Sequence, residues 1–335
     1  MIRKRFQNKI TTGAFTFPVV IIISALLWGL IYFVKPEMEP VKDGYYFSQL
    51  INNLQLNEFF ERLINFLLYG VVICLLIGIN NKYSLIRTRT TFQACIYSLF
   101  IAVCPVLQPL QQGALVTSAV CISLYFLFRT YQKNEPTGYM FRSHLFLGLG
   151  SLLFPQLMYL FPIWIIGGYS MQSLTPRTFF AGLVGISLPY WFLLGHAFFY
   201  NEMQLFYAPF KELVLFSPIN LSTIPLWELI TVGVVFLITL ISIAHYLLNN
   251  YQDKIRTCSY LNFLVLLGVI LLVFLLLQPQ HTRVVLPILL VCTSILMGHF
   301  FALTNSKASN IFFIVSIILF IALLYCNLWM PYHNF

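Results

Sequence analysis

Hydrophobic and polar positions along this chain alternate in long blocks, not in short periods. Long apolar runs are separated by short polar segments that hold most of the charged residues. A helix needs about 20 apolar residues to cross the hydrocarbon core of a bilayer. It also satisfies every backbone hydrogen bond within its own segment, which a membrane interior demands. The pattern therefore predicts an all-α, polytopic integral membrane protein in which residues 1–335 form a single membrane domain.

About nine of these blocks have the length of a full span. They are residues 14–34, 62–80, 91–110, 113–129, 178–199, 226–248, 259–278, 285–303 and 310–329. A further block, 144–170, is long for one span and short for two, and Pro155 and Pro162 interrupt it. We predict that it forms a hairpin of two short helices that enters and leaves on the same side. Broken helices are tolerated at membrane depth where protein or a cavity covers the backbone.

The distribution of charge supports this hairpin. With it, all but five basic residues lie on the side of the N-terminus; the exceptions are Lys35, Lys42, Arg62, Lys211 and Arg283. Only two acids, Glu135 and Asp253, share that basic side. Loops rich in lysine and arginine remain in the cytoplasm. We therefore expect a protein of the cell inner membrane with a cytoplasmic N-terminus and an external C-terminus.

Two larger loops are then expected outside the membrane, at residues 35–61 and 200–225. Both mix aromatic residues and leucines with a few charges. In the first loop, the apolar residues between Tyr45 and Leu54 have the spacing of a short amphipathic helix. Such a helix lies in the plane of the membrane interface.

Composition limits the kinds of partner and site that the sequence predicts. The chain is 59% hydrophobic and 9% charged, and its net charge of +9 comes from short loops between spans, so it does not indicate a nucleic-acid partner. The seven cysteines lie in or beside apolar runs and form no CxxC pair. This pattern predicts neither a metal site nor a disulfide framework. No cofactor is indicated, membrane lipids are the expected surroundings, and protein partners are not predicted.

Asp43 is the first candidate for chemistry. It lies shortly after the first span and ahead of the expected interfacial helix, where a carboxylate is able to act as a general base at the membrane surface. Glu37 and Glu39 are close enough in sequence to assist. The alternative is a solvated acid that is favoured by the dipole at a helix start.

Arg283 is the second candidate, in the short outer connection QPQHTRVVLP. An arginine binds a phosphate through two parallel hydrogen bonds, and His281 is placed to help. The alternative is an interfacial arginine that pairs with lipid headgroups. An outer acid together with an outer arginine suggests a site for a lipid-linked phosphate donor.

Polar residues inside the spans are the third group. For His196, His245 and His299 we expect hydrogen bonds between helices or exposure at the interface. No acid or lysine lies in the middle third of a predicted span. That absence weakens an ion-coupled transporter, which needs a charge at membrane depth.

Three segments resemble an uncharacterised family of bacterial inner-membrane proteins. They are residues 79–90, 145–168 and 176–191. The family has no established activity that the resemblance would carry to this chain.

Three other features are similar to the GT-C superfamily of polytopic glycosyltransferases. These are DGYYFSQLINNL (43–54), the short-helix segment 145–168, and TRVVLPILL (282–290). The resemblance implies a polyprenyl-phosphate-linked sugar donor. Two departures are visible: Gly44 follows Asp43 where many of these enzymes have a second acid, and Phe154 and Pro155 replace a basic residue in the short-helix segment.

The leading hypothesis is therefore a GT-C-like glycosyltransferase of cell-envelope glycan assembly. Asp43 would act as the base on the acceptor hydroxyl, and Arg283 with His281 would bind the donor phosphate. The alternatives are a non-enzymatic membrane scaffold or accessory subunit, and a lipid or glycolipid transporter.

Overall fold

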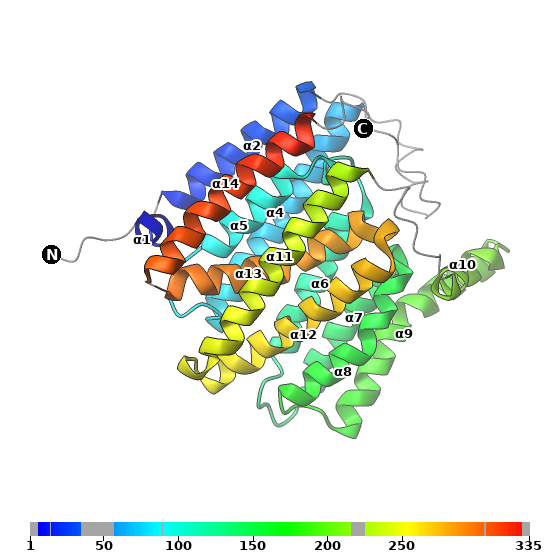
Figure 1. Cartoon of the computed structure of the whole chain (residues 1–335). Helices are drawn as coiled ribbons and strands as arrows, with labels where there is room; N and C mark the ends of the chain where they lie inside the picture. The colour runs from blue at the N-terminus through cyan, green and yellow to red at the C-terminus, as the bar shows by residue number, and fades with distance from the viewer. Residues whose placement is uncertain are drawn as a thin grey trace.

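The structure, a computed structural model, describes residues 6–13, 15–34, 57–88, 90–215, 225–304 and 306–329. Regular structure in these ranges is helical throughout. Seven of the helices in the described ranges are long and apolar enough to cross a membrane. They are α2 (Thr16–Val34), α4 (Glu58–Tyr83), α9 (Pro176–Phe199), α11 (Leu226–Asn249), α12 (Ile255–Leu277), α13 (Thr282–Leu303) and α14 (Lys307–Trp329). The prediction of an all-α, polytopic membrane protein is confirmed (Figure 1).

One of the predicted spans forms a shorter helix than the sequence pattern suggested. Residues 91–110 contain α5 (Phe92–Val103), whereas α6 (Gln112–Phe128) matches the predicted span 113–129 within one residue. The cause is Pro105, because a proline disfavours helical backbone at the residue before it. Cys104 has φ −99° and ψ 97°, and α5 ends there.

The predicted hairpin is present but begins earlier than residue 144. It consists of α7 (Thr137–Leu153), the 3₁₀ turn η2 (Pro155–Leu160) and α8 (Phe161–Ser170). Its two ends meet: the Gln132 amide donates to the carbonyl of Met171 (3.0 Å), and Ser173 Oγ donates to Thr130 Oγ1 (3.0 Å). The hairpin therefore enters and leaves at the same end of the bundle.

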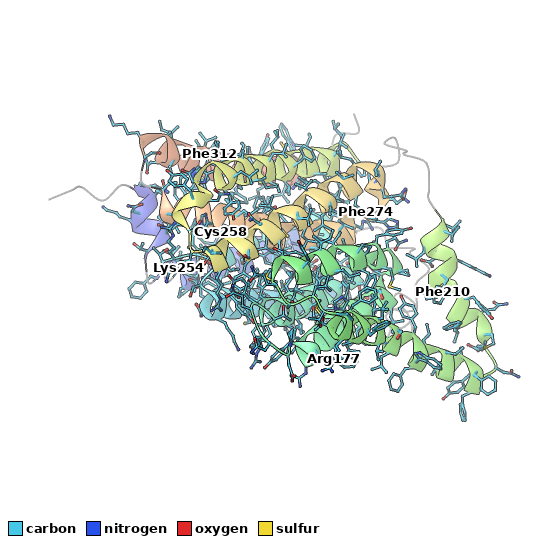
Figure 2. All side chains as sticks on the ribbon, turned by 90° about the horizontal axis from the view of Figure 1, so that it is seen from below. Arg177, Phe210, Lys254, Cys258, Phe274 and Phe312 are labelled. Carbon is cyan, nitrogen blue, oxygen red and sulfur yellow. The ribbon has the colours of Figure 1, made fainter. Side chains whose placement is uncertain are left out.

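The bundle has two chemically different ends. The end that carries α1 (Phe6–Thr11) also holds residues 84–88, 129–136, 171–175 and 250–254, and we call it the α1 end. The second end holds residues 103–111, 154–160 and 278–281 and, beside η2, α10 (Met203–Val214). In Figure 2, Lys254 and Cys258 mark the α1 end of α12, whereas Phe274 and Phe210 of α10 lie toward the second end.

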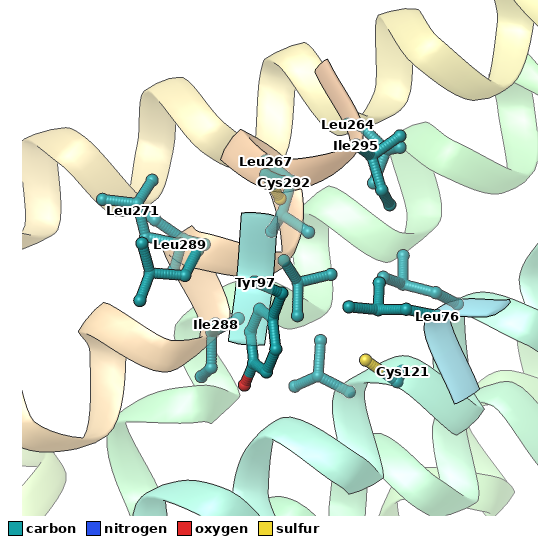
Figure 3. Close-up of a cluster of buried hydrophobic side chains, with 14 of the residues drawn as sticks. Leu76, Tyr97, Cys121, Leu264, Leu267, Leu271, Ile288, Leu289, Cys292 and Ile295 are labelled. Atoms are coloured by element: carbon teal, nitrogen blue, oxygen red, sulfur yellow. The ribbon is translucent and has the colours of Figure 1, made fainter. Parts of the chain in front are cut away.

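Helix α13 forms the centre of the bundle. All residues of its 18-residue apolar stretch are buried (100%), compared with 17% of the residues in the corresponding stretch of α2 and 22% in that of α14. It packs against α5, α6, α11 and α12. Figure 3 shows side chains of α5, α6, α12 and α13 meeting in one apolar cluster, with Tyr97 from α5, Cys121 from α6 and Leu267 from α12 beside Leu289 and Cys292 of α13.

Candidate functional site at the second end of the bundle

Three passages of the chain end at the second end in the same way. In each, a helix stops at the residue before a proline, and a short 3₁₀ turn follows. The residues before the prolines are Cys104, Phe154 and Gln278, and the turns are η1 (Pro105–Leu107), η2 and η5 (Pro279–His281). Each turn leaves backbone polar groups at the membrane boundary that a continuing helix would have paired within itself.

Direct contacts join these turns. The ring of His281 meets the ring of Phe154 edge-on, with 5.3 Å between centroids, so η5 lies against η2. Gly113, at the start of α6, faces the start of α13: a Cβ atom at this position would lie 2.7 Å from the Arg283 carbonyl oxygen. The absence of a side chain at Gly113 thus allows the two helix starts to touch.

Arg283 lies on the first turn of α13 and is partly exposed. Glu228, on the first turn of α11, is buried (7% exposed) and interacts electrostatically with Arg283. In the sequence, Glu228 is only an acid near the start of the predicted span 226–248. The missing information was tertiary, because α11 and α13 are brought together by packing and not by nearby sequence.

Several amide side chains are buried at this end. They are Gln108, Gln111, Gln112, Gln156 and Gln278. Gln111 Nε2 donates to the carbonyl of Val106 (3.1 Å), whereas Gln108 Oε1 accepts no hydrogen bond from a described residue. An amide offers both donors and acceptors, so these side chains are able to satisfy the backbone groups that the helix ends leave.

Asn65 of α4 holds the η1 turn through hydrogen bonds from its side chain. Its side chain is 0% exposed, and its amide nitrogen lies 2.7, 3.1 and 2.7 Å from the carbonyl oxygens of Leu107, Gln108 and Pro109. These carbonyls have no helical partner because the helix has already ended. A single asparagine therefore holds the segment that leads to Gly113.

Of the predicted site residues, Arg283 and His281 lie together at the start of α13. Asp43, Glu37, Glu39 and the interfacial helix expected at 43–54 lie outside the described residues. In the second predicted loop, α10 is amphipathic and packs on η2 and α9, through a hydrogen bond from Tyr159 to the Leu213 carbonyl and a ring contact between Tyr190 and Phe210 (5.4 Å).

A second polar cluster, at the α1 end, was missed in the sequence. The Asp253 side chain is 0% exposed; it accepts a hydrogen bond from Arg87 Nε (2.7 Å), and His299 Nε2 lies 3.0 Å from its other oxygen. A hydrogen bond between helices or exposure at the interface had been expected for His299; the side chain is buried and pairs with an acid in the connection before α12. One feature of the sequence could have indicated this cluster: Asp253 is one of only two acids on the side of the membrane that carries most of the basic residues.

The described residues contain no group of three metal-ligating side chains. Comparisons of the chain with protein-family models, with curated proteins and with solved structures found no match.

Proposed function

We propose that this multi-pass membrane protein is a GT-C-like glycosyltransferase that takes a sugar from a polyprenyl-phosphate donor in the assembly of cell-envelope glycans. The reaction would take place at the second end of the bundle. The protein would lie in the cell inner membrane, and its basic α1 end would face the cytoplasm.

One observation carries this proposal: Arg283, His281, Glu228 and the buried glutamines converge where three chain passages leave the helical state. The arginine offers a fixed fork of donors for a phosphate. The amide oxygen of Gln108, to which no described residue donates, would accept a hydrogen bond from a sugar hydroxyl. The location, at the end of the spans, is where the headgroup of a lipid-linked donor would lie while its hydrocarbon stays in the bilayer.

The proposed chemistry is a displacement at the anomeric carbon of the donor sugar. The acceptor hydroxyl oxygen forms the new glycosidic bond, the bond from the anomeric carbon to the phosphate oxygen breaks, and the polyprenyl phosphate leaves. Asp43 receives the proton of the acceptor hydroxyl. Arg283 stabilises the negative charge that develops on the leaving phosphate, with His281 beside it.

The test compares envelope glycans and lipid-linked sugars in three strains: the parent, a deletion strain, and the deletion strain complemented with the Asp43→Asn protein. We expect the deletion to lack a sugar or to accumulate a lipid-linked precursor. We expect Asp43→Asn, present at normal level, to leave that defect uncorrected because it removes the base.

A matched control is Glu202→Gln, which neutralises an exposed acid at the same end. This variant should complement fully. If the deletion leaves all glycans unchanged, or if Asp43→Asn complements fully, the transferase hypothesis is wrong. Radiolabelled substrate flux in proteoliposomes would then separate a transporter from a scaffold.

A further inference from the structure

A groove with two compartments runs along α2, α4 and α5. Helices α2 and α4 are joined chiefly through α5, which forms the floor between them. The compartment within the membrane is an apolar cavity of about 230 Å³. Phe17 and Ile21 of α2 line it, opposite Tyr69 and Cys74 of α4. The small residue Gly70 leaves part of the space open, since nothing lies within 4 Å of where its Cβ would be.

The second compartment is polar and lies at the α1 end. It is a cavity of about 380 Å³ lined by Thr11, Thr12, Thr16, Asn81 and Thr91, among others. It lies next to the apolar compartment: Thr16 lines the polar cavity and the following residue, Phe17, lines the apolar one. The two cavities are also neighbours along α5, where Cys95 lines the first and Ser98, one turn further on, lines the second.

The groove opens toward the bilayer. Val19, Ile22 and Leu26 of α2 are exposed, as are Leu67 and Val71 of α4. On membrane-spanning helices these side chains face lipid. An apolar cavity of this size stays dry. The surrounding hydrocarbon is therefore its natural occupant.

The length of the apolar compartment matches one acyl chain of one leaflet. From Phe17 to Trp28 the axis of α2 advances about 16 Å at 1.5 Å per residue. Half of a hydrocarbon core is about 15 Å. The contact between the rings of Trp28 and Phe66 (5.3 Å) closes the far end of the groove. A long isoprenoid chain would not be contained in this space.

We infer that the groove is a binding site for one phospholipid from the leaflet on the α1 side. An acyl chain fills the apolar compartment and the headgroup occupies the polar one. Lys9 is exposed and directly precedes Ile10, which lines the polar compartment, so the local charge favours an anionic headgroup. This site is separate from the proposed transferase site and does not depend on it.

The experiment uses the full chain in nanodiscs of phosphatidylethanolamine and phosphatidylglycerol, with a phosphatidylglycerol probe that carries a diazirine in one acyl chain. Crosslinked peptides are mapped by mass spectrometry. We expect labels on the groove segments of α2, α4 and α5. Gly70→Leu should fill the cavity and reduce these labels at least fivefold.

Gly78→Leu is the matched control, because Gly78 is on the same helix, is exposed and also has open space around its Cβ position. It should keep groove labelling within twofold of the parent, and thermal melting of both variants should match the parent. Thr12→Glu, which adds a negative charge to the polar compartment, should weaken labelling by phosphatidylglycerol more than by an equivalent phosphatidylethanolamine probe.

Unchanged labelling in Gly70→Leu would overturn the inference, as would equal loss in both leucine variants. Displacement of the probe by polyprenyl phosphate but not by phospholipid would also overturn it, since the occupant would then be a carrier lipid. None of these outcomes bears on the glycan experiment, so the two proposals fail separately.

Discussion

The two ends of helix α13 carry opposite kinds of polar chemistry. At the α1 end, His299 and Arg87 enclose the Asp253 carboxylate, and both of its oxygens have a basic partner. At the second end, Arg283 is partly exposed and interacts with Glu228 without a direct ion pair in the described part of the chain, and Gln108 Oε1 accepts no hydrogen bond from a described residue. The charge at the α1 end is fully paired, whereas the charge at the second end is not.

This difference separates stability from function along one helix. A buried charge that already has its partners holds the chain in place, and removing one partner leaves an uncompensated charge. A site that binds and releases a ligand must keep part of its capacity free. We therefore expect substitutions at the α1 end to affect folding and substitutions at the second end to affect activity.

The largest effect is expected for Asp253→Ala. It leaves the buried His299 without a hydrogen-bond partner and removes the charged acceptor of the exposed Arg87, at a cost of about 3 kcal/mol in the free energy of unfolding. Thermal melting of the purified protein measures this. Glu135→Ala removes an exposed acid at the same end and should leave the melting temperature unchanged. Equal melting of both variants would show that the cluster does not stabilise the fold.

Arg283→Gln should have the next largest effect, on activity alone. Loss of one preorganised donor to a developing oxyanion costs about 100-fold in rate, or about 2.7 kcal/mol. The measurement is the rate at which the complemented strain consumes the lipid-linked precursor. Lys211→Gln, which removes an exposed cation on α10, should have no effect. A stable Arg283→Gln protein with full activity would exclude a phosphate-binding role for Arg283.

Gly113→Ala should have a smaller effect, at the second end. The new methyl group would press on the Arg283 carbonyl oxygen and separate the starts of α6 and α13. Overpacking of this kind costs about 1.5 kcal/mol, and we expect activity to fall about tenfold because Arg283 moves with its helix. Gly138→Ala, at an open position on α7, is the control. Identical activity in both variants would contradict close packing of the two helix starts.

The smallest perturbation tests which end faces the cytoplasm. Cysteines introduced at Lys254 and Arg177, both exposed at the α1 end, should not react with a membrane-impermeant maleimide added to intact cells. A cysteine at Lys211 on α10 should react. Labelling of either α1-end position from outside would reverse the orientation and move the proposed site to the cytoplasmic side.

The sequence was sufficient for the parts of the fold that depend on local chemistry. Apolar block length predicted the spans, and charge bias with Pro155 predicted a hairpin that returns to its own side. The same reasoning missed the shortening of α5, although Pro105 was visible, because an apolar run continues past it. The helix break at Pro279, in contrast, agrees with the prediction, because the predicted span 259–278 ends directly before this proline and α12 ends at Leu277.

The candidate site was predictable only in part, for a physical reason. Arg283 and His281 are neighbours in sequence, so their proximity required no knowledge of packing. Glu228 and Gln108 join them through the packing of α5, α6, α11 and α13, and Asp253 reaches His299 in the same way. Pairs of this kind follow from tertiary structure, which a single sequence does not specify.

The complete burial of α13 also constrains how the protein is made. The chain is synthesised from its N-terminus, so α5, α6, α11 and α12 enter the membrane before the helix that they surround. Until α13 arrives, polar groups that it will satisfy, such as Thr239 with its hydroxyl partner Thr293, face an unfilled slot. Among the described helices only α14 follows. The central helix of the bundle is thus inserted after the helices that surround it. A chain halted before Thr282 would expose the unfilled slot to the bilayer and to the quality-control machinery of the cell.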